Sequence, residues 1–561
     1  MTVTATTAGT VVDAVRRWAR ERPGHAAFTF LDHEVDPRGV PVSITWAELD
    51  ARARGLAGEL RRRCAPGDRA LLLLPQGLDY VVAFVACLYA DVLAVPLFPI
   101  AGEGHRERLD GILRDCAPKL ALTSAPVDAP GDLGLDVVVV GGVPPSAEPP
   151  VPRLGGPAYL QYTSGSTRTP AGVVVTDRNF RVNVRQALTA YGLAEVEPSP
   201  VSWLPLFHDM GLVLGVGVAL ATGAEAVLMD PRAFLYRPSR WLGAMSGRRN
   251  VISAGPNFAY DLCVRRVSAA DRSGLDLSGV VALINGSEPV HAATVARFQD
   301  AFEPCGLRPD AQRPSYGLAE ATVLVTAASR PTTTGFDRAA LARGRVVVTE
   351  DPERASVLVG CGGAVDQHLA IVDPATGAPV EGDRVGEIWV CGENVSPGYW
   401  SGSRSGQDGF GARLDVPGLP DGPWLRTGDL GVLHEDQLYV VGRIKDLIVV
   451  DGRNHYPQDV EAVAAGADDV IRRGHVAAFA VPSDDGEVMV VVAERTSEAP
   501  RESVDQARVR ARVRAAVSRR YDVPVRDVLV VEPGSVPRTS SGKLSRSACR
   551  DRYLAGDLPI S

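Results

Sequence analysis

Lysine is the scarcest charged residue in this chain of 561 residues. Lys119, Lys445 and Lys543 are the only lysines among its 59 lysine and arginine side chains. Lysine carries a compact ammonium on a flexible stem, whereas arginine carries a broad planar fork. A lysine kept against this background is a candidate for a role that arginine cannot fill, and the loop around Lys543 makes it the strongest candidate. Compositional drift is the alternative, and Lys119, which lies outside every motif, fits it.

Metal-thiolate and nucleic-acid chemistry have little support in the composition. The eight cysteines form no Cys-x-x-Cys pair and no cysteine–histidine cluster with the spacing of zinc ligands. This pattern favours a reduced, cytoplasmic chain. The net charge of −8, with no long basic block, argues against a dedicated nucleic-acid-binding protein.

Long hydrophobic runs are also missing. The N-terminal residues lack the charged start and the apolar core of a signal peptide. The most apolar stretch, residues 78–100, is interrupted by Asp79, Asp91, Pro96 and Pro99. It predicts a buried helix followed by a strand, so we expect a soluble cytoplasmic protein with no membrane span.

Short apolar runs alternate with helical patterns, which predicts an α/β fold with largely parallel sheets. A chain of this length exceeds one hydrophobic core. Its texture changes after Gly442, so we predict a large N-terminal domain of layered α/β subdomains (residues 1–442) and a small mobile α+β domain (residues 443–561). Strands are expected at residues 71–74, 137–140, 226–229, 280–284, 346–348, 475–481 and 488–493, and helices at 80–90, 291–302 and 507–521.

The strongest local motif is the loop Thr163-Ser164-Gly165-Ser166-Thr167, which separates two apolar runs. Backbone N–H groups and hydroxyls gathered in one turn suit phosphate oxygens. The loop is not a Walker motif, which occurs nowhere in the chain. Taken alone, it is equally compatible with a flexible serine–threonine turn.

Two further clusters contain groups that suit a nucleotide. Residues 537–543 form a second serine-rich loop, which places Lys543 on a turn near the end of the chain. Tyr316 and Gly317 precede Glu320, and together they offer an aromatic face and a carboxylate for a hard cation. A solvated lysine and a structural tyrosine–glutamate pair are the alternatives.

Asp429 and His208 are the remaining candidates. Asp429 is expected in a glycine turn, where it can accept hydrogen bonds from two sugar hydroxyls or merely cap the turn. His208 lies beside Asp209 in apolar surroundings, as a catalytic dyad or a satisfied core histidine. The chain has no Gly-x-Ser-x-Gly motif of a serine hydrolase.

Taken in order, these motifs resemble those of the adenylate-forming superfamily of acyl-CoA synthetases, peptide-synthetase adenylation domains and luciferases. The resemblance covers nearly the whole chain, and residues 160–173, 203–212, 442–461 and 537–544 are most similar to fatty acyl-AMP ligases. It implies that a fatty carboxylate attacks the α-phosphorus of ATP, giving acyl-adenylate and pyrophosphate. The phosphopantetheine thiol of an acyl carrier protein then takes the acyl group, in polyketide, nonribosomal-peptide or lipid biosynthesis.

The same resemblance implies a role for each matching residue. The ATP phosphates would be held by Thr163, Ser164, Gly165, Ser166 and Thr167, and the adenine would be flanked by Gly286, Ser287 and Glu288 and stacked on Tyr316, beside Gly317. Mg²⁺ would be bound by Glu320, with Thr163 as a second candidate. The ribose hydroxyls would be bound by Asp429, and the ribose and phosphate region by Arg443. The hinge would be Lys445, the lysine that reaches carboxylate and α-phosphate would be Lys543, and His208 would lie where the acyl chain meets the nucleotide.

The chemistry explains why these residue types are needed. A carboxylate is already ionised at neutral pH, so its attack on phosphorus requires no general base. Two anions must instead be held together while negative charge grows, and Mg²⁺ and a flexible ammonium neutralise that charge. An ammonium on a separate swinging domain allows the same site to be rebuilt for transfer to the thiol.

The chain departs from the superfamily pattern in the phosphate loop. Arg168 and Ala171 stand where relatives usually have glycine and lysine. The pyrophosphate contact of that lysine is therefore unassigned, and Arg168 is a candidate replacement although its larger fork cannot occupy the same place. The fatty acyl-AMP ligase branch is similar in this respect, which implies lineage rather than loss of activity.

Residues 330–360 bear on the choice of acceptor. Relatives that use coenzyme A look shorter here, and in the ligase branch an inserted segment restrains the small domain; a tolerated surface loop is the alternative. A fatty acyl-CoA synthetase is therefore the second enzymatic hypothesis, and a non-catalytic binding module is the third. A helix with six arginines between residues 507 and 521 is either a steering face for acidic carrier proteins or a solvated basic face.

The role implied for Lys543 generates a first prediction. Lys543→Ala should lower the rate of adenylation by several orders of magnitude, because the variant lacks the ammonium that faces both anions. Thioester formation from supplied acyl-adenylate should survive much better. Separate assays of the two half-reactions check this, and equal damage to both would make Lys543 a structural residue.

Overall fold

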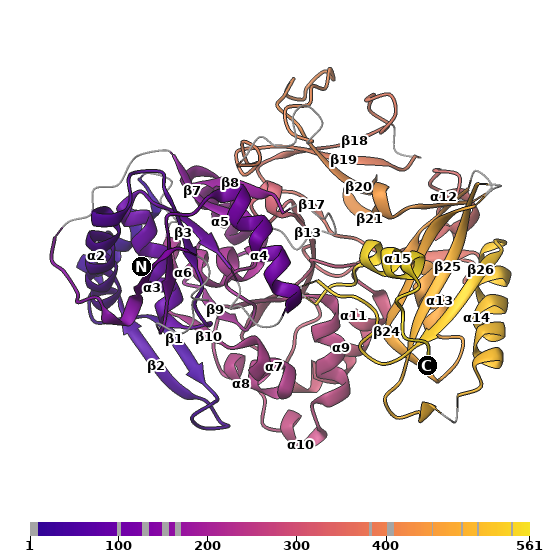
Figure 1. The fold of residues 1–561 in the computed structure, drawn as a ribbon, viewed down its shortest axis with the longest axis horizontal. Coiled ribbons are helices and arrows are strands. Elements are labelled where there is room, and N and C mark those ends of the chain that lie inside the picture. The colour runs from indigo at the N-terminus through magenta and orange to yellow at the C-terminus, as the bar shows by residue number, and fades with distance from the viewer. Residues whose placement is uncertain are drawn as a thin grey trace.

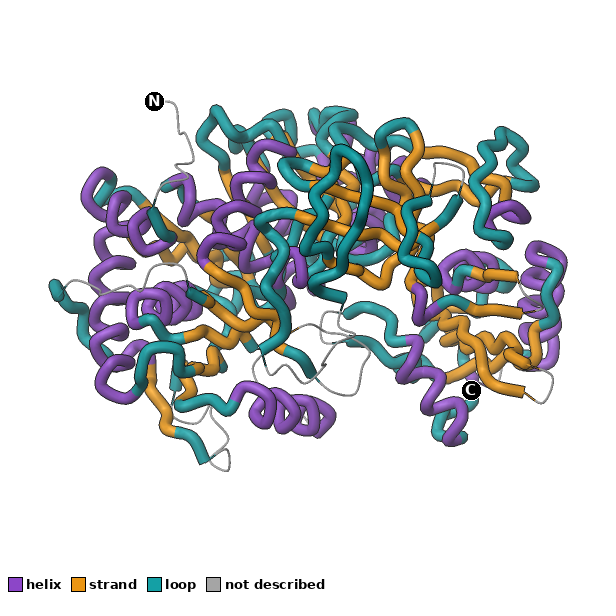
Figure 2. Tube along the Cα trace, turned by 90° about the horizontal axis from the view of Figure 1, so that it is seen from above, coloured by secondary structure: helices purple, strands orange, loops and turns teal. Residues whose placement is uncertain are grey.

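The computed structural model describes residues 9–97, 103–125, 134–148, 156–162, 170–380, 384–400, 409–450, 453–483, 486–501, 504–539 and 542–561. Figure 1 shows the N-terminal elements at one end of the molecule and the C-terminal strands and helices at the other. Figure 2, seen from above, shows loops between these two groups. The α/β fold class predicted from the sequence is confirmed.

The larger N-terminal sheet has nine strands in the described part of the chain. Its centre is parallel from β13 to β1, and β2, β14 and β17 are antiparallel to their neighbours. In spatial order the strands are β17 (Gly363–Ala364), β14 (Thr326–Ala327), β13 (Gln312–Tyr316), β12 (Val280–Asn285), β11 (Val251–Gly255), β9 (Ser199–Ser202), β10 (Ala226–Met229), β1 (Ala26–Asp32) and β2 (Val40–Thr45).

A second N-terminal sheet has six strands among the described residues. In spatial order they are β6 (Asp136–Val139), β5 (Leu120–Thr123), β3 (Arg69–Leu72), β4 (Leu93–Pro96), β7 (Pro157–Tyr162) and β8 (Gly172–Thr176). All neighbours are parallel except β7 and β8. The hydroxyl-rich loop joins this antiparallel pair.

Helix α3 (Leu78–Ala90) packs against both sheets, because it contacts β1 of the larger sheet and β3 and β4 of the smaller one. Its side chains are apolar around nearly the whole circumference, as expected for a helix buried on every side. The buried helix followed by strand β4 is therefore as predicted. Among the described residues, no helix has the length and apolarity needed to cross a membrane. The other N-terminal helices are α1 (Val11–Glu21), α2 (Trp46–Arg63), α4 (Glu103–Cys116), α5 (Asp177–Ala190), α6 (Val218–Thr222), α7 (Pro231–Tyr236), α8 (Ser239–Met245), α9 (Asn257–Arg266), α10 (Ala269–Arg272) and α11 (Ala292–Phe302).

A four-stranded antiparallel sheet was not anticipated from the sequence. It consists of β18 (His368–Val372), β19 (Gly386–Cys391), β20 (Leu425–His434) and β21 (Gln437–Arg443). Asp429 lies on β20, so its predicted place in a glycine turn is wrong. Gly428 has φ of +71°, and the β20–β21 register shifts at Leu430. The strand is irregular at this point, which explains why its glycine resembled that of a turn.

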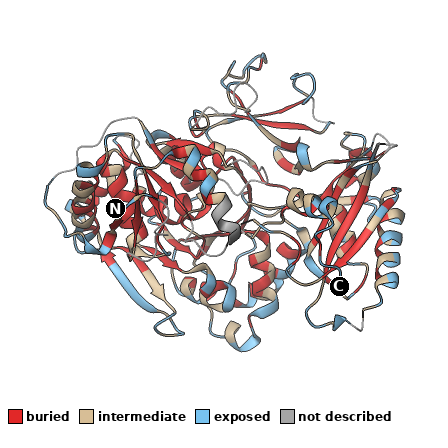
Figure 3. Ribbon diagram, viewed as in Figure 1, coloured by how far each residue is buried: buried red, intermediate tan, exposed pale blue. Residues whose placement is uncertain are grey.

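The C-terminal elements have their own hydrophobic cores. The valines of α14 (Gln506–Tyr521), Val509, Val513 and Val517, are spaced four apart and pack on the sheet, with arginines between them. Figure 3 shows this sheet buried and the outer face of α14 exposed. The sheet consists of β24 (Ile471–Ser483), β25 (Gly486–Arg495) and β26 (Val525–Val531), accompanied by β22 (Ile448–Val450), β23 (Arg453–His455), α13 (Pro457–Ala465) and α15 (Arg546–Ala555). Tyr456 packs instead with residues before Gly442, and the mobility of this part stays a prediction.

Residues 330–360 form a small hairpin with a helical turn. Strands β15 (Thr333–Asp337) and β16 (Ala355–Val359) pair antiparallel, and α12 (Arg338–Leu341) follows β15. The strand predicted at residues 346–348 is wrong: Val347 and Val348 are 45% and 49% exposed, and Val348 makes an isolated bridge to Phe336. The three valines in a row suggested a buried strand, but they do not pair within a sheet, and Val347 and Val348 remain exposed.

The packing of α3 gives a prediction for stability. The ring of Phe84 is 1% exposed and lies 5.6 Å from the Tyr159 ring, measured between centroids. Phe84→Ala should lower the free energy of unfolding by about 3–5 kcal/mol, because a cavity opens between the two sheets. Val35→Ala, at a side chain 74% exposed, should change it by less than about 0.5 kcal/mol. Urea unfolding checks both variants, and equal effects would contradict the role of α3 as the joint core.

Candidate functional site

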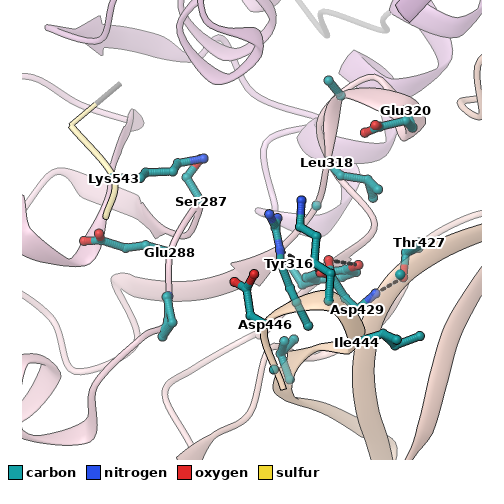
Figure 4. Close-up of a pocket in the computed structure, with 18 of the residues that line it drawn as sticks. Ser287, Glu288, Tyr316, Leu318, Glu320, Thr427, Asp429, Ile444, Asp446 and Lys543 are labelled. Carbon is teal, nitrogen blue, oxygen red and sulfur yellow. Dashed lines mark hydrogen bonds and ion pairs between the residues drawn. The ribbon is translucent and has the colours of Figure 1, made fainter. Parts of the chain in front are cut away.

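A cavity of about 1660 Å³ lies between the C-terminal ends of the parallel strands, the four-stranded sheet and the C-terminal loop that holds Lys543. Figure 4 shows side chains from these segments converging on it. The predicted site residues that line it are His208, Ser287, Glu288, Tyr316, Gly317, Glu320, Asp429, Arg443, Lys445 and Lys543. Gly286 directly precedes this wall, whereas Thr163, Ser164, Gly165, Ser166 and Thr167, together with Arg168, lie outside the described residues.

Two adjacent parallel strands bring one wall together. Strands β12 and β13 pair in register, so the segments that follow them, residues 286–288 and 317–320, meet at the same sheet edge. A Cβ atom on Gly286 would lie 2.8 Å from the Ser315 carbonyl oxygen, and one on Gly317 only 1.6 Å from the Val323 carbonyl oxygen. These two glycines are required by close approach of backbone segments.

Tyr316, Asp429 and Arg443 form a connected polar group that joins this wall to the four-stranded sheet. The Tyr316 hydroxyl donates to Asp429 Oδ2 at 2.8 Å, and Arg443 Nε lies 2.9 Å from Asp429 Oδ1. Asp429 and Arg443 are register partners on β20 and β21. Asp429 raises the pKa of the Arg443 guanidinium, although burial opposes this. The group therefore holds one carboxylate between a phenol and a permanent cation.

Glu320 lies on a tight turn after β13. The Tyr399 hydroxyl donates to Glu320 Oε1 at 2.7 Å, which orients the carboxylate. Thr322 has φ of +71°, which is strained for a β-branched residue. The side chain of Asn183, fully buried on α5, accepts from the backbone N–H groups of Val323 and Leu324 and holds this turn.

His208 and Asp209 form a pair at the edge of the cavity. His208 Nδ1 lies 2.7 Å from Asp209 Oδ1, and the Met210 N–H also donates to Asp209 Oδ1 at 2.7 Å. Burial alone would raise the pKa of Asp209, but His208 and Lys543 hold it below its ordinary value. The arrangement gives an ionised carboxylate near Lys543 and orients the imidazole with it.

Lys543 lies on a tight hairpin. Thr539 N–H donates to the Lys543 carbonyl oxygen at 2.8 Å, and Gly542, with φ of +81°, donates to the Thr539 carbonyl oxygen at 2.8 Å. Arg538 and Leu544 close the hairpin as bridge partners. Burial lowers the pKa of Lys543, while Asp209 raises it. Lys543 thus enters the cavity with its side chain beside Ser287, as Figure 4 shows, and the charges of Asp209 and Glu288 oppose the effect of burial on its pKa.

Glu288 shares this environment. The Phe258 N–H donates to Glu288 Oε1 at 2.7 Å. Burial raises the pKa of Glu288, whereas this hydrogen bond and the charge of Lys543 lower it. Ser287 has φ of +68°, so the chain turns sharply where the adenine wall was predicted.

Lys445 lies between two groups of ion pairs, which we call the N-terminal and C-terminal anchors. On its N-terminal side, Arg443 is paired with Asp429. On its C-terminal side, Asp446 lies 3.2 Å from Arg546 Nη1, and Arg546 also makes two hydrogen bonds of 2.7 and 2.8 Å to the Glu461 carboxylate. These two carboxylates raise the pKa of Arg546 despite its burial.

Sequence reasoning missed several residues of this site. Tyr399 and Asn183 come from segments remote from any motif, and nothing local marks them. Arg546 and Glu461 lie within or next to the quoted motifs. Their spacing from Lys543 and Lys445 offered a usable signal, because charged side chains close to a catalytic loop often orient it.

The sequence profile of AMP-binding enzymes matches residues 15–400. The chain is 43% identical over 566 residues to the long-chain-fatty-acid–AMP ligase FadD26 of Mycobacterium marinum, with 96% of each chain covered. It is also 41% identical over 570 residues to FadD21 of Mycobacterium tuberculosis, a relative named as a fatty-acid–CoA ligase, with 97% of each chain covered. A crystal structure of the fatty acyl-adenylate ligase of L. pneumophila, in complex with acyl adenylate and pyrophosphate, superposes with a TM-score of 0.75 at 35% identity, covering 98% of this chain and 97% of that one.

The electrostatics of Lys543 predict a pH dependence. Deprotonation of Lys543 should abolish its interaction with anions, and burial lowers its pKa below the ordinary 10.5, so adenylation should fall on the alkaline side of neutrality. Asp209→Asn keeps an acceptor for His208 but removes a charge that raises the pKa of Lys543. This alkaline limb should therefore move to lower pH in the variant.

The measurement is the rate of adenylation as a function of pH. Glu435→Gln is the matched control, because the Glu435 side chain is 83% exposed and pairs only with the neighbouring His434 at 4.0 Å. An alkaline limb that stays in place in Asp209→Asn would contradict the coupling between Asp209 and Lys543.

Proposed function

We propose, from the premise that the chain belongs to the AMP-binding enzyme family, that it is an ATP-dependent fatty acyl-AMP ligase. One observation carries this proposal. Lys543, from the C-terminal part, enters the same cavity as Asp429, Glu320 and Tyr316 from the N-terminal part. The relatives named as fatty-acid–AMP ligases support a fatty carboxylate as the substrate.

In the first step a carboxylate oxygen of the fatty acid attacks the α-phosphorus of ATP. The bond from this phosphorus to the bridging oxygen breaks, and pyrophosphate leaves with the electron pair. Lys543 lies between the two anions and neutralises the charge that grows on them. Burial lowers the pKa of Lys543, and the charge of Asp209 opposes this, which favours the ammonium form.

The nucleotide would lie between the two walls of the cavity. Gly286, Ser287 and Glu288 flank the adenine and Tyr316 offers its ring, with Gly317 giving the backbone room. Asp429 has both oxygens occupied by Tyr316 and Arg443, but each carboxylate oxygen has a further lone pair for a ribose hydroxyl. Arg443 contacts the ribose and phosphate, and the loop Thr163–Thr167 holds the remaining phosphates.

Glu320 fits the requirements of Mg²⁺. Glu320 lines the cavity and its Oε1 accepts from Tyr399, so its second carboxylate oxygen would supply a hard ligand. No group of three or more histidine, cysteine, aspartate or glutamate side chains suited to a metal occurs in the described ranges. That suits an ion held by one carboxylate, by Thr163 and by substrate phosphates. The ion supplies charge neutralisation at the phosphates.

In the second step the sulfur of a thiol attacks the acyl carbonyl carbon, and AMP leaves with the electrons of the carbon–oxygen bond. Lys543 has no task in this step and must give way to the thiol. We infer that the C-terminal part (residues 443–561) pivots at Lys445, because the two anchors on either side of it are separate. His208 lies where the acyl chain would meet the nucleotide.

The acceptor we propose is the phosphopantetheine of an acyl carrier protein, in polyketide or lipid biosynthesis in the cytoplasm. The hairpin of residues 330–360 supports it, because it contacts the C-terminal part at several points. Arg520 Nη1 donates to the Glu353 carbonyl oxygen at 3.1 Å, and the Ser356 hydroxyl donates to Asp459 at 2.9 Å. Such contacts restrain the pivot, which is what the ligase branch implies. Coenzyme A is the second candidate, favoured by the name of the FadD21 relative.

Ion pairs offset part of the positive charge of the arginine-rich helix α14. Arg512 and Arg508 share Asp468 at 2.9 and 3.9 Å, and Arg520 lies 3.6 Å from Glu353. Arg514 donates to the Val525 carbonyl oxygen at 3.1 Å, which leaves its charge in place. Electrostatic steering of an acidic carrier would therefore depend mainly on Arg510, Arg514 and Arg519.

A single experiment tests the function and the acceptor. The purified chain is given a fatty-acid mixture and ATP, with coenzyme A or a holo-carrier protein in parallel, and the products are read by intact mass. We expect fatty-acid-dependent pyrophosphate exchange and acyl-carrier formation, with little acyl-CoA. Absence of exchange would leave a non-catalytic binding module, and efficient acyl-CoA formation would make the chain a CoA synthetase.

A further inference from the structure

Helix α4 packs against the base of the phosphate loop through one face. Arg108, Gly111 and Asp115 are spaced three and four residues apart, so they lie on the same side of the helix. A Cβ atom on Gly111 would lie 2.8 Å from Pro170 Cδ, so the glycine permits direct contact between the helix and the end of the loop. This face therefore points at the segment where the loop returns to strand β8.

Asp115 fixes the helix to both ends of the loop. The Tyr162 hydroxyl, at the end of β7, donates to Asp115 Oδ2 at 2.5 Å. The Gly172 N–H, at the start of β8, lies 3.3 Å from the same oxygen. One carboxylate thus holds the two strands between which the loop runs, and Arg108 lies two helical turns away on the same face.

Arg108 lines the cavity beside Tyr162, Pro170 and Ala171. It is partly buried, and burial lowers its pKa. A guanidinium stays charged in proteins even so. The helix therefore presents a fixed positive charge next to the position at which this chain has alanine in place of the usual loop lysine.

Three other arginines line the described part of the cavity wall, and they come from β20, β21 and α15 rather than from the segments around the phosphate loop. Arg443 is paired with Asp429, Arg426 lies 3.0 Å from Glu387, and Arg546 is bound to Glu461 and Asp446. Lys543 enters the cavity from the C-terminal loop, beside Ser287. Within the described part of the cavity wall, Arg108 is the cation on the phosphate-loop side.

We propose that Arg108 is a catalytic residue that binds the departing pyrophosphate and takes the place of the loop lysine missing at Ala171. This inference rests on the proposed adenylation. When the α-phosphorus bond breaks, the added negative charge appears on pyrophosphate, and a planar guanidinium can contact two of its oxygens at once. A cation on an anchored helix needs no reorganisation at that moment, unlike a lysine on a loop.

Pyrophosphate exchange kinetics test the proposal, with inorganic pyrophosphate as the varied reactant. Arg108→Ala should raise the KM for pyrophosphate roughly ten- to a hundredfold, as expected for the loss of one charged contact, and leave the KM for the fatty acid within about twofold of wild type. Arg108→Gln, which keeps helix propensity and length, should behave alike. Arg114→Ala is the matched control, because Arg114 is exposed on another face of the same helix and donates to the Asp110 carbonyl oxygen.

A second variant, with a lysine restored to the loop, gives the decisive test. Ala171→Lys in the Arg108→Ala background should recover most of the lost pyrophosphate affinity, because it returns a cation to the same anion from the other side. Unchanged pyrophosphate KM in both Arg108 variants, or a rise only in Arg168→Ala, would overturn the proposal. The wild type reports separately on the proposed function, which fails if it shows no fatty-acid-dependent exchange.

Discussion

The ion pair between Asp429 and Arg443 is the contact on which the rest of the site depends. It joins register partners on β20 and β21 at the last residue of β21, just before the chain leaves the four-stranded sheet. Asp429 is 6% exposed, so without this cation its charge would be costly to bury. Because the Tyr316 hydroxyl donates to the other carboxylate oxygen, this one carboxylate connects the cavity wall at the end of β13 with the segment that leads to the C-terminal part.

The connection to the C-terminal part is a short segment between two groups of ion pairs. Arg443 belongs to the N-terminal anchor, and Asp446 belongs to the C-terminal anchor through Arg546 and Glu461. Between them stand Ile444 and Lys445, both exposed. Arg546 follows Lys543 by three residues and ties this loop to α13 through Glu461. In the proposed pivot, Lys543 would therefore move together with the C-terminal part, so that rotation at Lys445 would insert or withdraw one ammonium.

Local patterns were sufficient for much of the fold and insufficient for its contacts. Strand β10 and helix α11 follow from apolar runs and helical spacing, and motif order placed ten predicted residues around one cavity. The four-stranded sheet was missed because its strands pair antiparallel around irregular positions such as Gly428. The run at residues 346–348 looked like a strand, but burial is decided by neighbours the sequence does not reveal. Tyr316 and Asp429 are separated by 113 positions, and Tyr399 reaches Glu320 across 79, so neither contact has a local signature.

The hairpin of residues 330–360 meets the C-terminal part largely through its main chain. Arg520 donates to the carbonyl oxygens of Pro352, Glu353 and Ala355, the Asn454 N–H donates to the Ala342 carbonyl oxygen, and the Tyr456 hydroxyl donates to the Leu341 carbonyl oxygen. A carbonyl oxygen is supplied by every residue type. Most side chains along the hairpin can therefore be exchanged over evolutionary time without loss of these hydrogen bonds, provided that the backbone path is kept. The exceptions are Arg338 and Ser356, whose own side chains donate to the C-terminal part. Constraint on sequence then falls mainly on the donors in the C-terminal part, such as Arg520, and the rest of the hairpin is free to diverge.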